Sequence, residues 1–421
     1  MFGKRIIMSK NVAVIGYGVV GSGTVELFMK NREAISKKIG RDCDIKYILD
    51  LRDFPESPFA DRIIHDFDTI LNDDEIEVVA EVVGGTTFAY EYTKKLLAKG
   101  KSVVTSNKAL VAAYGAELLQ LAQDNGCSYL FEASVGGGIP IIRPLNKCLA
   151  GNEIQQISGI LNGTTNFILT KMIKDQMSFE DALKLAQQLG YAEADPTADV
   201  EGEDACRKIC ILGSLVYGKH IYPEMVHKSG ITRITLDDVE YAENAGYVIK
   251  LIASVKRLDD GSLSAIVCPR LVPKSNMLAS VDDVYNAVSV TGDGVGDVLF
   301  YGQGAGKLPT ASAVVGDIID CLRHQGRALG IHWEESKKDE KFVVRYKDTN
   351  CSMYVRLKGE DVQALKPSIS EMFGKLMYIE RSNRPDDELA FITPNMVESD
   401  IDANLTILSH SAEIASKIRM F

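Results

Sequence analysis

The chain lacks the sequence features that mark membrane, zinc-binding and disulfide-rich proteins. No apolar run approaches the roughly 20 residues that a helix needs to span a bilayer. The six histidines form no H-x-x-x-H or H-E-x-x-H pattern, and the eight cysteines form no C-x-x-C pair. Neither a zinc site nor a disulfide framework is therefore indicated. The N-terminal stretch MFGKRIIMSK has no long apolar segment, so we expect no signal peptide, a dispensable first seven residues and a cytoplasmic location.

The chain has fewer basic residues than acidic ones. The chain has 47 Lys and Arg against 58 Asp and Glu, a net charge of -11 and a pI of about 5.2. This balance argues against a general nucleic-acid-binding surface. A length of 421 residues exceeds what one hydrophobic core supports, so we expect two or three domains.

A glycine-rich turn follows the first expected strand, Val12–Ile15. Gly16, Gly18 and Gly21 fit the pattern G-x-G-x-x-G, in which the glycines allow a tight turn, close approach of a pyrophosphate and close packing of helix on strand. The free N–H groups at the start of the next helix would face the phosphates. A purely structural glycine turn is the alternative. The expected cofactor contacts at this turn are Gly16, Tyr17, Gly18, Val19, Val20 and Gly21.

Further strands and helices alternate along the first third of the chain. Helical stretches ending in glycine separate the expected strands, which are residues 44–50, 77–83, 102–107 and 128–133. Alternating strands and helices predict an α/β fold with a mostly parallel, doubly wound sheet of the Rossmann type.

Two charged residues near the end of the second strand bear on cofactor choice. Asp50 could bond a ribose 2′-OH and so favour NAD, whereas Arg52 could hold the 2′-phosphate of NADP. Both could also be ordinary polar residues at a strand end. The sequence leaves NAD or NADP open.

The middle third begins a different pattern near residue 136. A run of three glycines precedes Pro140 and an expected helix, and a strand then enters a polar loop at 162–166. The segment from Ser178 to Gly190 reads as a helix, with Ser178 as its N-cap and Gly190 as its stop.

A buried helix is expected over residues 200–216, where apolar residues surround one pair of opposite charges. Asp204 and Lys208 are four apart and so lie on one helical face. Such a pair is ordinarily a surface salt bridge. Because a helix that is apolar on all sides is buried, we interpret Asp204 and Lys208 as part of a functional site.

Four stretches together resemble the homoserine dehydrogenase family. They are GYGVVG at the first turn, TSNKAL around Lys108, GYAEADPTADVEGEDACRK, and GQGAGKLPTASAVVGDI at 302–318. The resemblance implies NAD(P)-dependent interconversion of L-aspartate 4-semialdehyde and L-homoserine, in threonine and methionine biosynthesis. It implies Lys208 and Lys108 as the catalytic lysines. The substrate-binding residues that it implies are Glu193, Asp204, Asp199, Gly163, Thr164 and Tyr191.

The family resemblance also implies further cofactor and cation contacts. The additional cofactor contacts are Gly85, Thr86, Ser106, Lys108 and Gly304. A sodium site is implied at Glu132 with the backbone carbonyls of Val135, Gly137 and Ile139. Carboxylate and carbonyl oxygens suit such a hard cation, but an ordinary glycine loop is the alternative.

The last residues predict a separate module. After Trp333 and the charged run EESKKDEK, the sequence reads as β-α-β-β-α-β, which resembles an ACT regulatory domain. The turn after its first strand, KGEDVQAL, has Gly359 but lacks the Pro-Gly typical of ACT effector sites. Threonine feedback and a purely structural or dimerising role are both open.

The expected domains follow from these segments. Residues 1–135, completed by 300–325, form the nucleotide domain. Residues 136–299 form an α+β catalytic and dimerisation domain, and residues 340–421 form the ACT-like domain. We expect a homodimer or homotetramer. The competing hypotheses are another amino-acid or aldehyde dehydrogenase of this architecture, and a non-catalytic NAD(H)-sensing regulator.

Overall fold

The computed structural model describes residues 11–324, 330–337, 340–382 and 384–421, and the chain divides into two compact units. Unit 1 comprises Met1–Asn152, Cys210–Pro223 and Gly302–Lys337; unit 2 comprises Glu153–Ile209, Glu224–Tyr301 and Lys338–Phe421. The first seven residues lie outside the described part. All eight cysteines are free. Among the described helices, none is long and apolar enough to cross a membrane.

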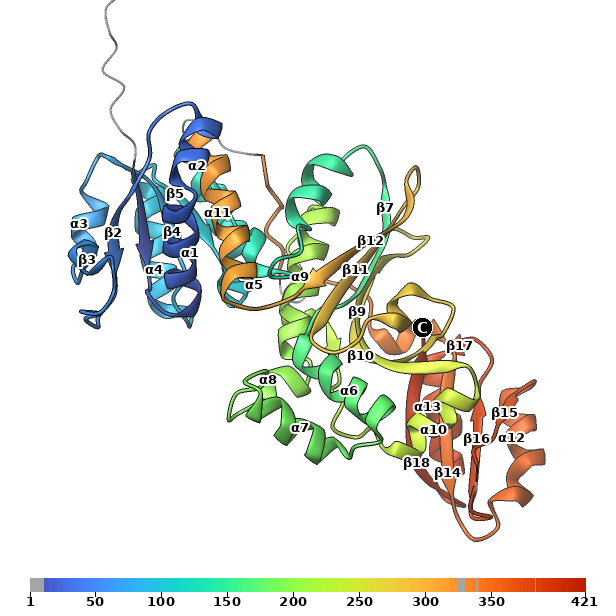
Figure 1. Ribbon diagram of the computed structural model, residues 1–421. Helices are drawn as coiled ribbons and strands as arrows, with labels where there is room; N and C mark the ends of the chain where they lie inside the picture. Colours follow the sequence, from blue (N-terminus) through green and yellow to red (C-terminus); the bar gives the residue numbers. More distant parts are fainter. Residues whose placement is uncertain (1–10, 325–329, 338–339, 383) are drawn as a thin grey trace, which may run out of the picture. The chain divides into compact units, whose positions relative to one another are not determined.

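Unit 1 is built on a six-stranded parallel sheet (Figure 1). The strand order is β3-β2-β1-β4-β5-β6, which is the order of a doubly wound dinucleotide-binding sheet. The strands are β1 (Asn11–Ile15), β2 (Ile45–Leu49), β3 (Ile63–Ile64), β4 (Ile76–Glu81), β5 (Ser102–Thr105) and β6 (Tyr129–Leu130). The central strands are buried on both faces, as parallel strands are when helices cover both sides.

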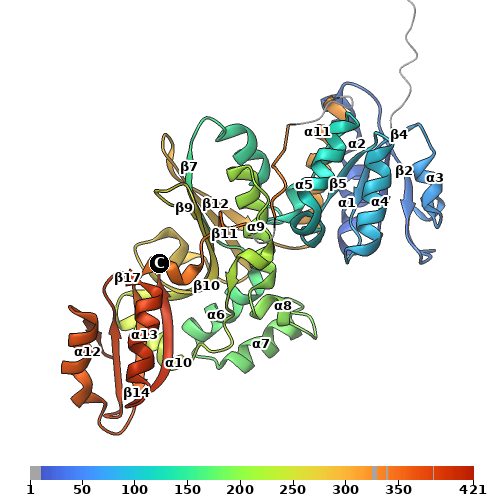
Figure 2. The same cartoon turned by 180° about the vertical axis from the view of Figure 1, so that it is seen from behind.

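Helices cover both faces of this sheet. In the two opposite views, α1, α2 and α11 lie on one face and α4 and α5 on the other (Figures 1 and 2). Although α11 comes late in the chain, it packs along α1. The helices are α1 (Val19–Lys30), α2 (Arg32–Ile39), α3 (Phe67–Leu71), α4 (Thr87–Ala98), α5 (Lys108–Asp124) and α11 (Lys307–His324).

The end of the nucleotide sheet differs from the sequence expectation. The strand expected at 128–133 is only Tyr129–Leu130, because a 3₁₀ turn at Glu132–Ser134 bends the chain away from the sheet. The helix expected after Pro140 is a short π-helical turn, Pro144–Cys148.

Trp333 does not mark the start of a separate segment. Its side chain is almost fully buried in unit 1, where its indole N–H donates to His220 Nδ1 at 3.0 Å. A Cβ added at Gly115 would lie 2.5 Å from the Trp333 ring, so α5 accommodates the indole only because it has glycine there. Trp333 therefore anchors the chain to unit 1.

Unit 2 is built on a mixed sheet of ten strands. The order is β12-β11-β7-β9-β10-β18-β14-β16-β15, and β8 also pairs with β10. The strands are β7 (Ile154–Ile160), β8 (His227–Lys228), β9 (Tyr247–Arg257), β10 (Leu263–Pro273), β11 (Tyr285–Gly292), β12 (Gly296–Gln303), β14 (Met353–Lys358), β15 (Met377–Ile379), β16 (Glu388–Ile392) and β18 (Glu413–Met420). A separate pair is formed by β13 (Asn350–Cys351) and β17 (Met396–Val397).

The helices between β7 and β9 confirm one expectation and correct two. Ser178 caps α7 (Phe179–Gln188) by accepting from the Asp181 N–H at 3.1 Å, as predicted. The segment 162–166 is not a loop, because Asn162 caps α6 (Gly163–Asp175). The helix expected over 200–216 is two helices, α8 (Thr197–Val200) and α9 (Glu203–Tyr217), separated at Gly202, where φ is +81°.

The tail has the element order expected from sequence, with α12 (Lys366–Phe373) and α13 (Glu398–Leu408) between its strands. Side chains of β14 alternate between two faces. Met353, Val355 and Leu357 pack in a core with α12 and α13, whereas Tyr354 and Arg356 bond Asp238 of α10 (Leu236–Asn244). Because β18 also pairs with β10, the tail and the segment 153–301 share one sheet.

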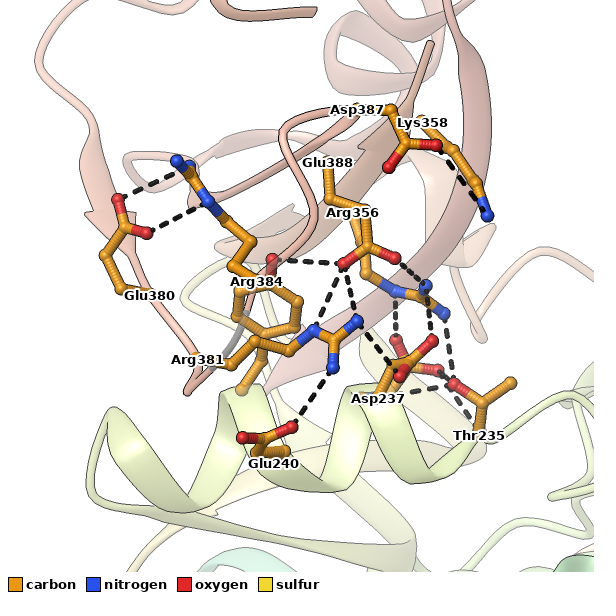
Figure 3. A network of polar contacts seen from close by, with 12 residues as sticks. Thr235, Asp237, Glu240, Arg356, Lys358, Glu380, Arg381, Arg384, Asp387 and Glu388 are labelled. Carbon is orange, nitrogen blue, oxygen red and sulfur yellow. Dashed lines mark hydrogen bonds and ion pairs between the residues drawn. The ribbon is translucent and has the colours of Figure 1, made fainter.

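An arginine network joins the tail to α10 (Figure 3). Arg356 bonds Asp238 at 3.0 Å and Glu388 at 3.3 Å, and Arg381 bonds Glu388 at 3.0 Å and Glu240 at 3.1 Å. Asp238 and Glu388 are almost fully buried. A buried carboxylate needs such a partner, because an isolated charge is costly to remove from water.

Candidate active site

The glycine turn of unit 1 has the geometry of a phosphate site. Gly16 has φ of +97°, a conformation that favours glycine. A Cβ added at Gly21 would lie 1.9 Å from the Gly16 carbonyl oxygen, whereas one added at Gly18 would meet nothing within 4 Å. Gly21 is thus required for packing, and Gly18 leaves open space beside the start of α1. No side chain caps that helix and no acidic residue lies in its first turn, so its positive end suits a phosphate.

Asp50 and Arg52 form an ion pair at the carboxyl end of β2. Asp50 accepts from Arg52 Nε at 3.0 Å and from the Tyr17 backbone N–H at 2.8 Å. These bonds, with Arg52 the larger influence, lower the pKa of Asp50 to about 2. Asp50 is thereby fixed against the glycine turn, while the Arg52 side chain is 65% exposed. Because Asp50 and Arg52 lie side by side, this strand end is compatible with either NAD or NADP.

The ends of β4 and β5 are joined by a polar chain that leads to Lys108. Glu81 accepts from the Thr105 hydroxyl at 2.7 Å, and the Asn107 amide donates to the Gly85 carbonyl at 2.6 Å. Asn107 also caps α5, whose first residue is Lys108. The cap fixes the start of α5, and with it Ser106 and Lys108, beside the loop that carries Gly85 and Thr86. Burial raises the pKa of Glu81 to about 7.

The geometry around Glu132 favours a helix cap more than a cation ligand. Its carboxylate accepts the backbone N–H groups of Ile141, Ile142 and Arg143 at 2.6, 2.9 and 2.8 Å. A carboxylate has about four acceptor positions, so Glu132 could offer at most one more contact to a cation. Within the described residues, no group of three or more His, Cys, Asp or Glu side chains could hold a metal.

The glycines near Glu132 have a packing reason of their own. A Cβ added at Gly137 would lie 2.5 Å from the Gly304 carbonyl oxygen, and the Gly138 N–H donates to the Gln303 carbonyl at 3.0 Å. The two glycine-rich loops, of which the first also contains Val135 and Ile139, therefore pack backbone against backbone in unit 1. This contact places Gly304 beside Gly137.

The catalytic candidates of unit 2 meet at the start of α9. Lys208 Nζ lies 2.7 Å from Asp204 Oδ2 and donates to the Leu161 carbonyl at 2.6 Å. Asp204 and Lys208 are 4% and 7% exposed. The expectation of a buried rather than a surface ion pair is thus confirmed. Burial this deep is rare for lysine unless it is paired.

The central connecting residue, Asn162, was absent from the site expected from sequence. Its side-chain amide donates to Asp199 at 2.7 Å and to Asp204 at 2.9 Å, while its oxygen accepts from the Thr165 N–H. The N-cap pattern of Asn162 ahead of α6 is the signal that could have revealed it. Burial, and next the Asp204 charge, raise the pKa of Asp199.

The remaining substrate candidates lie along the same unit. The Thr164 hydroxyl donates to the Tyr191 carbonyl at 2.7 Å. A Cβ added at Gly163 would lie 2.8 Å from the Val284 carbonyl oxygen, so close packing of α6 needs this glycine. Tyr191 and Glu193 are exposed. Unit 2 thus presents the buried pair Asp204 and Lys208, together with the half-buried Asp199 and the exposed Glu193.

Comparisons with known proteins match nearly the whole chain. The family descriptions "Homoserine dehydrogenase" and "Homoserine dehydrogenase, NAD binding domain" match residues 140–319 and 16–132. Homoserine dehydrogenase of Bacillus subtilis (strain 168) is 37% identical, covering 97% of this chain and 98% of that one. The Corynebacterium glutamicum enzyme is 36% identical over 94% and 92%. This chain belongs to the homoserine dehydrogenase family.

Solved structures of homoserine dehydrogenases share the fold. The enzyme from Thiobacillus denitrificans has a TM-score of 0.88 at 33% identity, covering 98% of both chains. A hyperthermophilic archaeal homoserine dehydrogenase in complex with NADPH has a TM-score of 0.64 at 30% identity, covering 75% of this chain and 98% of that one. The protein is accordingly an NAD(P)-binding oxidoreductase of amino-acid biosynthesis with homoserine dehydrogenase activity. That activity implies L-homoserine and L-aspartate 4-semialdehyde as its substrates.

Proposed function

We propose that Lys208 is the acid–base catalyst of the homoserine dehydrogenase reaction. The observation that supports this role is a buried ammonium held by Asp204 and the Leu161 carbonyl. As the aldehyde is reduced, negative charge develops on its oxygen, and the Lys208 ammonium stabilises that charge and donates the proton. In the oxidising direction the neutral amine accepts the proton of the homoserine hydroxyl. A bound NAD(P) supplies only the exchange of hydride with the carbon.

Lys108 and the carboxylates take supporting roles in this proposal. Lys108 provides a second positive charge at the start of α5. Glu193 binds the substrate ammonium, for which an exposed carboxylate is suited, and Asp204 orients Lys208 and the substrate. Asp199, Gly163, Thr164 and Tyr191 shape the pocket, and Asn162 positions both Asp199 and Asp204.

The cofactor is held, in this proposal, by the glycine turn and the strand ends of unit 1. The pyrophosphate lies at Gly18 and the start of α1, with Tyr17, Val19 and Val20 around it. Asp50 or Arg52 contacts the ribose or its phosphate, so both NAD and NADP are compatible. Gly85, Thr86, Ser106 and Gly304 contact the nicotinamide half. No step is assigned to a sodium ion at Glu132, and that site stays a prediction.

The tail is proposed to be an ACT-like module. Support comes from the strand order β18-β14-β16-β15, all antiparallel, with α12 and α13 on one face. Its lack of a Pro-Gly turn after β14 favours a structural or dimerising role over threonine feedback, and a homodimer or homotetramer remains the expected state. The three-domain division and the cytoplasmic location also stay predictions.

A spectrophotometric assay tests the proposed roles. The full-length chain is mixed with L-homoserine and with NAD⁺ or NADP⁺ in turn, and absorbance of the reduced nicotinamide is followed. Homoserine-dependent reduction that is lost in Lys208→Ala, with cofactor binding retained, is expected. Cofactor binding without any turnover at alkaline pH would instead favour the NAD(H)-sensing regulator.

A further inference from the structure

One cavity of unit 2 has no part in the proposed reaction. It has a volume of about 730 Å³, within the range of small-molecule pockets. Residues from β8, β10, α13, β18 and the turn Tyr346–Asp348 line it. None of the residues that we assign to catalysis, substrate or cofactor is among them.

The cavity exists because β10 changes partner along one edge. β9 pairs with the whole of the other edge. On the edge away from β9, Ile266 and Val267 pair with β8, and Arg270 and Leu271 pair with β18. Cys268 and Pro269 lie between these two pairings and line the cavity. Pro269 has no N–H to offer a further strand, so the opening is built into the sheet.

Positive charge exceeds negative charge in the lining. The four cationic side chains are Arg233, Lys347, Lys417 and Arg419, and the two carboxylates are Glu398 and Asp402. Asp402 is shared by Lys347 and Lys417, at 2.7 Å from each, and Glu398 pairs with Arg419. Both carboxylates are therefore already neutralised. Such a concentration of cations is unusual in a chain of net charge -11.

Arg233 is the cation whose charge is least compensated. It is exposed at the cavity, and no carboxylate of the described residues lies within ion-pair distance of it. A guanidinium presents several N–H donors in one plane and so matches a carboxylate or phosphate.

A stacked pair of rings, His227 and Tyr346, also lines the cavity. The His227 ring stacks on Tyr346 with centroids 3.7 Å apart and planes 13° from parallel. Arg419 donates to the Tyr346 carbonyl at 3.1 Å. Burial first, and then the charges of Arg419, Lys347 and Lys417, lower the pKa of His227. His227 is thus a neutral, polar wall rather than a further cation at neutral pH.

We propose that this cavity is a binding site for a small dianion, a dicarboxylate or a phosphate-bearing metabolite, held chiefly by Arg233 and Lys417. The excess of two positive charges matches such a ligand, and His227, Tyr346 and Ser229 offer neutral polar contacts around it. The site is distinct from the turn after β14 where an ACT effector would bind.

Titration calorimetry of the full-length chain at constant ionic strength tests the site, with inorganic phosphate and succinate as probes. We expect saturable binding of at least one probe. Phosphate binding more tightly would indicate phosphorylated ligands, and succinate binding more tightly would indicate dicarboxylates. Arg233→Gln and Lys417→Gln should each weaken binding by about tenfold, the loss of one charge-assisted hydrogen bond.

Lys358→Gln is the matched control, because Lys358 is an exposed lysine of the tail that does not line the cavity. It should bind the probes as the unmodified chain does. Arg233 makes no ion pair with any residue that the structure describes, so its replacement breaks no such pair and the variant stays informative. Absence of saturable binding overturns the proposal. Equal affinity in all variants also overturns it, since the anion would then bind elsewhere, for example at the start of α1.

Discussion

The ammonium of Lys208 lies in a protein interior, where two forces act on it in opposite directions. Desolvation favours the neutral amine, whereas Asp204 at 2.7 Å favours the charged ammonium. A proton-transfer group needs both forms within reach. The contact with Asp204 and the Leu161 carbonyl also fixes the position of Nζ, which a surface salt bridge would not do.

Replacing Lys208 with alanine should lower kcat by roughly 10²–10⁴-fold, the usual contribution of an acid–base group. Steady-state kinetics with L-homoserine measure this change, and titration of the cofactor should show an almost unchanged Kd. Arg207→Ala is the control, because Arg207 is the neighbouring cation of α9 and forms a partly exposed pair with Glu203. A near-normal kcat with a lower melting temperature in Lys208→Ala would make the pair structural.

Replacing Asn162 with alanine should change the pH profile as well as the rate. The Asn162 amide lowers the pKa of Asp199, against burial and the Asp204 charge. Its removal should therefore move the acidic limb of kcat/KM to higher pH. Asn276→Ala removes the N-cap of the short helix Met277–Ser280 and should leave the profile in place. An unshifted limb in Asn162→Ala would limit Asn162 to capping α6.

At the scale of elements, two glycines of the turn between β1 and α1 have different roles: Gly21 is needed for packing, and Gly18 is expected to be needed for cofactor binding. Gly21→Ala should lower the melting temperature by several degrees, because its Cβ would lie 1.9 Å from the Gly16 oxygen. Gly18→Ala has space for its Cβ and should keep the melting temperature while weakening cofactor binding, since the methyl group occupies the expected pyrophosphate position. Thermal denaturation and cofactor titration of both variants check this. Equal cofactor affinity in Gly18→Ala would place the pyrophosphate elsewhere.

The buried Glu81 carboxyl, which bonds Thr105 at the ends of β4 and β5, should make the free energy of unfolding depend on pH. Burial raises the pKa of Glu81 to about 7 from its ordinary 4.5. Its folded-state pKa is above the unfolded value, so its contribution to stability is complete below about pH 4.5 and is lost as the pH rises through 7. The loss amounts to roughly 3 kcal/mol at most.

Urea denaturation at pH 5 and pH 8 measures this effect. The free energy of unfolding of the unmodified chain should fall between these pH values by more than that of Glu81→Gln, which cannot ionise. The glutamine oxygen can still accept from the Val83 N–H, and its NH₂ group can donate to the Thr105 hydroxyl. The same pH dependence in both proteins would show that Glu81 does not ionise in this range.

Local patterns predicted the elements whose signals lie within one segment. The glycine turn, the Ser178 cap and the buried face of α9 depend on adjacent residues, and the structure has all three. The role of Asn162 was missed because the two aspartates that its side chain bonds, Asp199 and Asp204, are distant from it in sequence. The polar run 162–166 was expected to be a loop, but Asn162 caps α6, which begins at Gly163. The backbone N–H groups of residues 141–143 that Glu132 accepts could not be predicted from its neighbours in sequence, and the sodium site there stays a prediction.

At the scale of the whole chain, the tail is continuous with the catalytic part of unit 2. Side chains of β14 point alternately to the two faces of the sheet. One face packs against α12 and α13, and the other faces α10. The sequence of β14 alone does not predict that α10, more than a hundred residues earlier in the chain, covers its second face. The shared sheet means that the tail contributes to the stability of unit 2, whatever it binds.

Replacing Arg356 with methionine should test how firmly the tail is held. Arg356 is 5% exposed, and its loss leaves Asp238, which is fully buried, without its cationic partner. Removing one partner of a buried ion pair typically costs roughly 3–5 kcal/mol. We therefore expect a clearly lower urea midpoint for Arg356→Met. Arg384→Met is the control, because the Glu380 partner of Arg384 is 63% exposed and an exposed pair contributes less than about 1 kcal/mol. If Arg356→Met lowered the urea midpoint no more than Arg384→Met does, the arginine network would not be what holds the tail to unit 2. The pairing of β18 with β10 would then hold it.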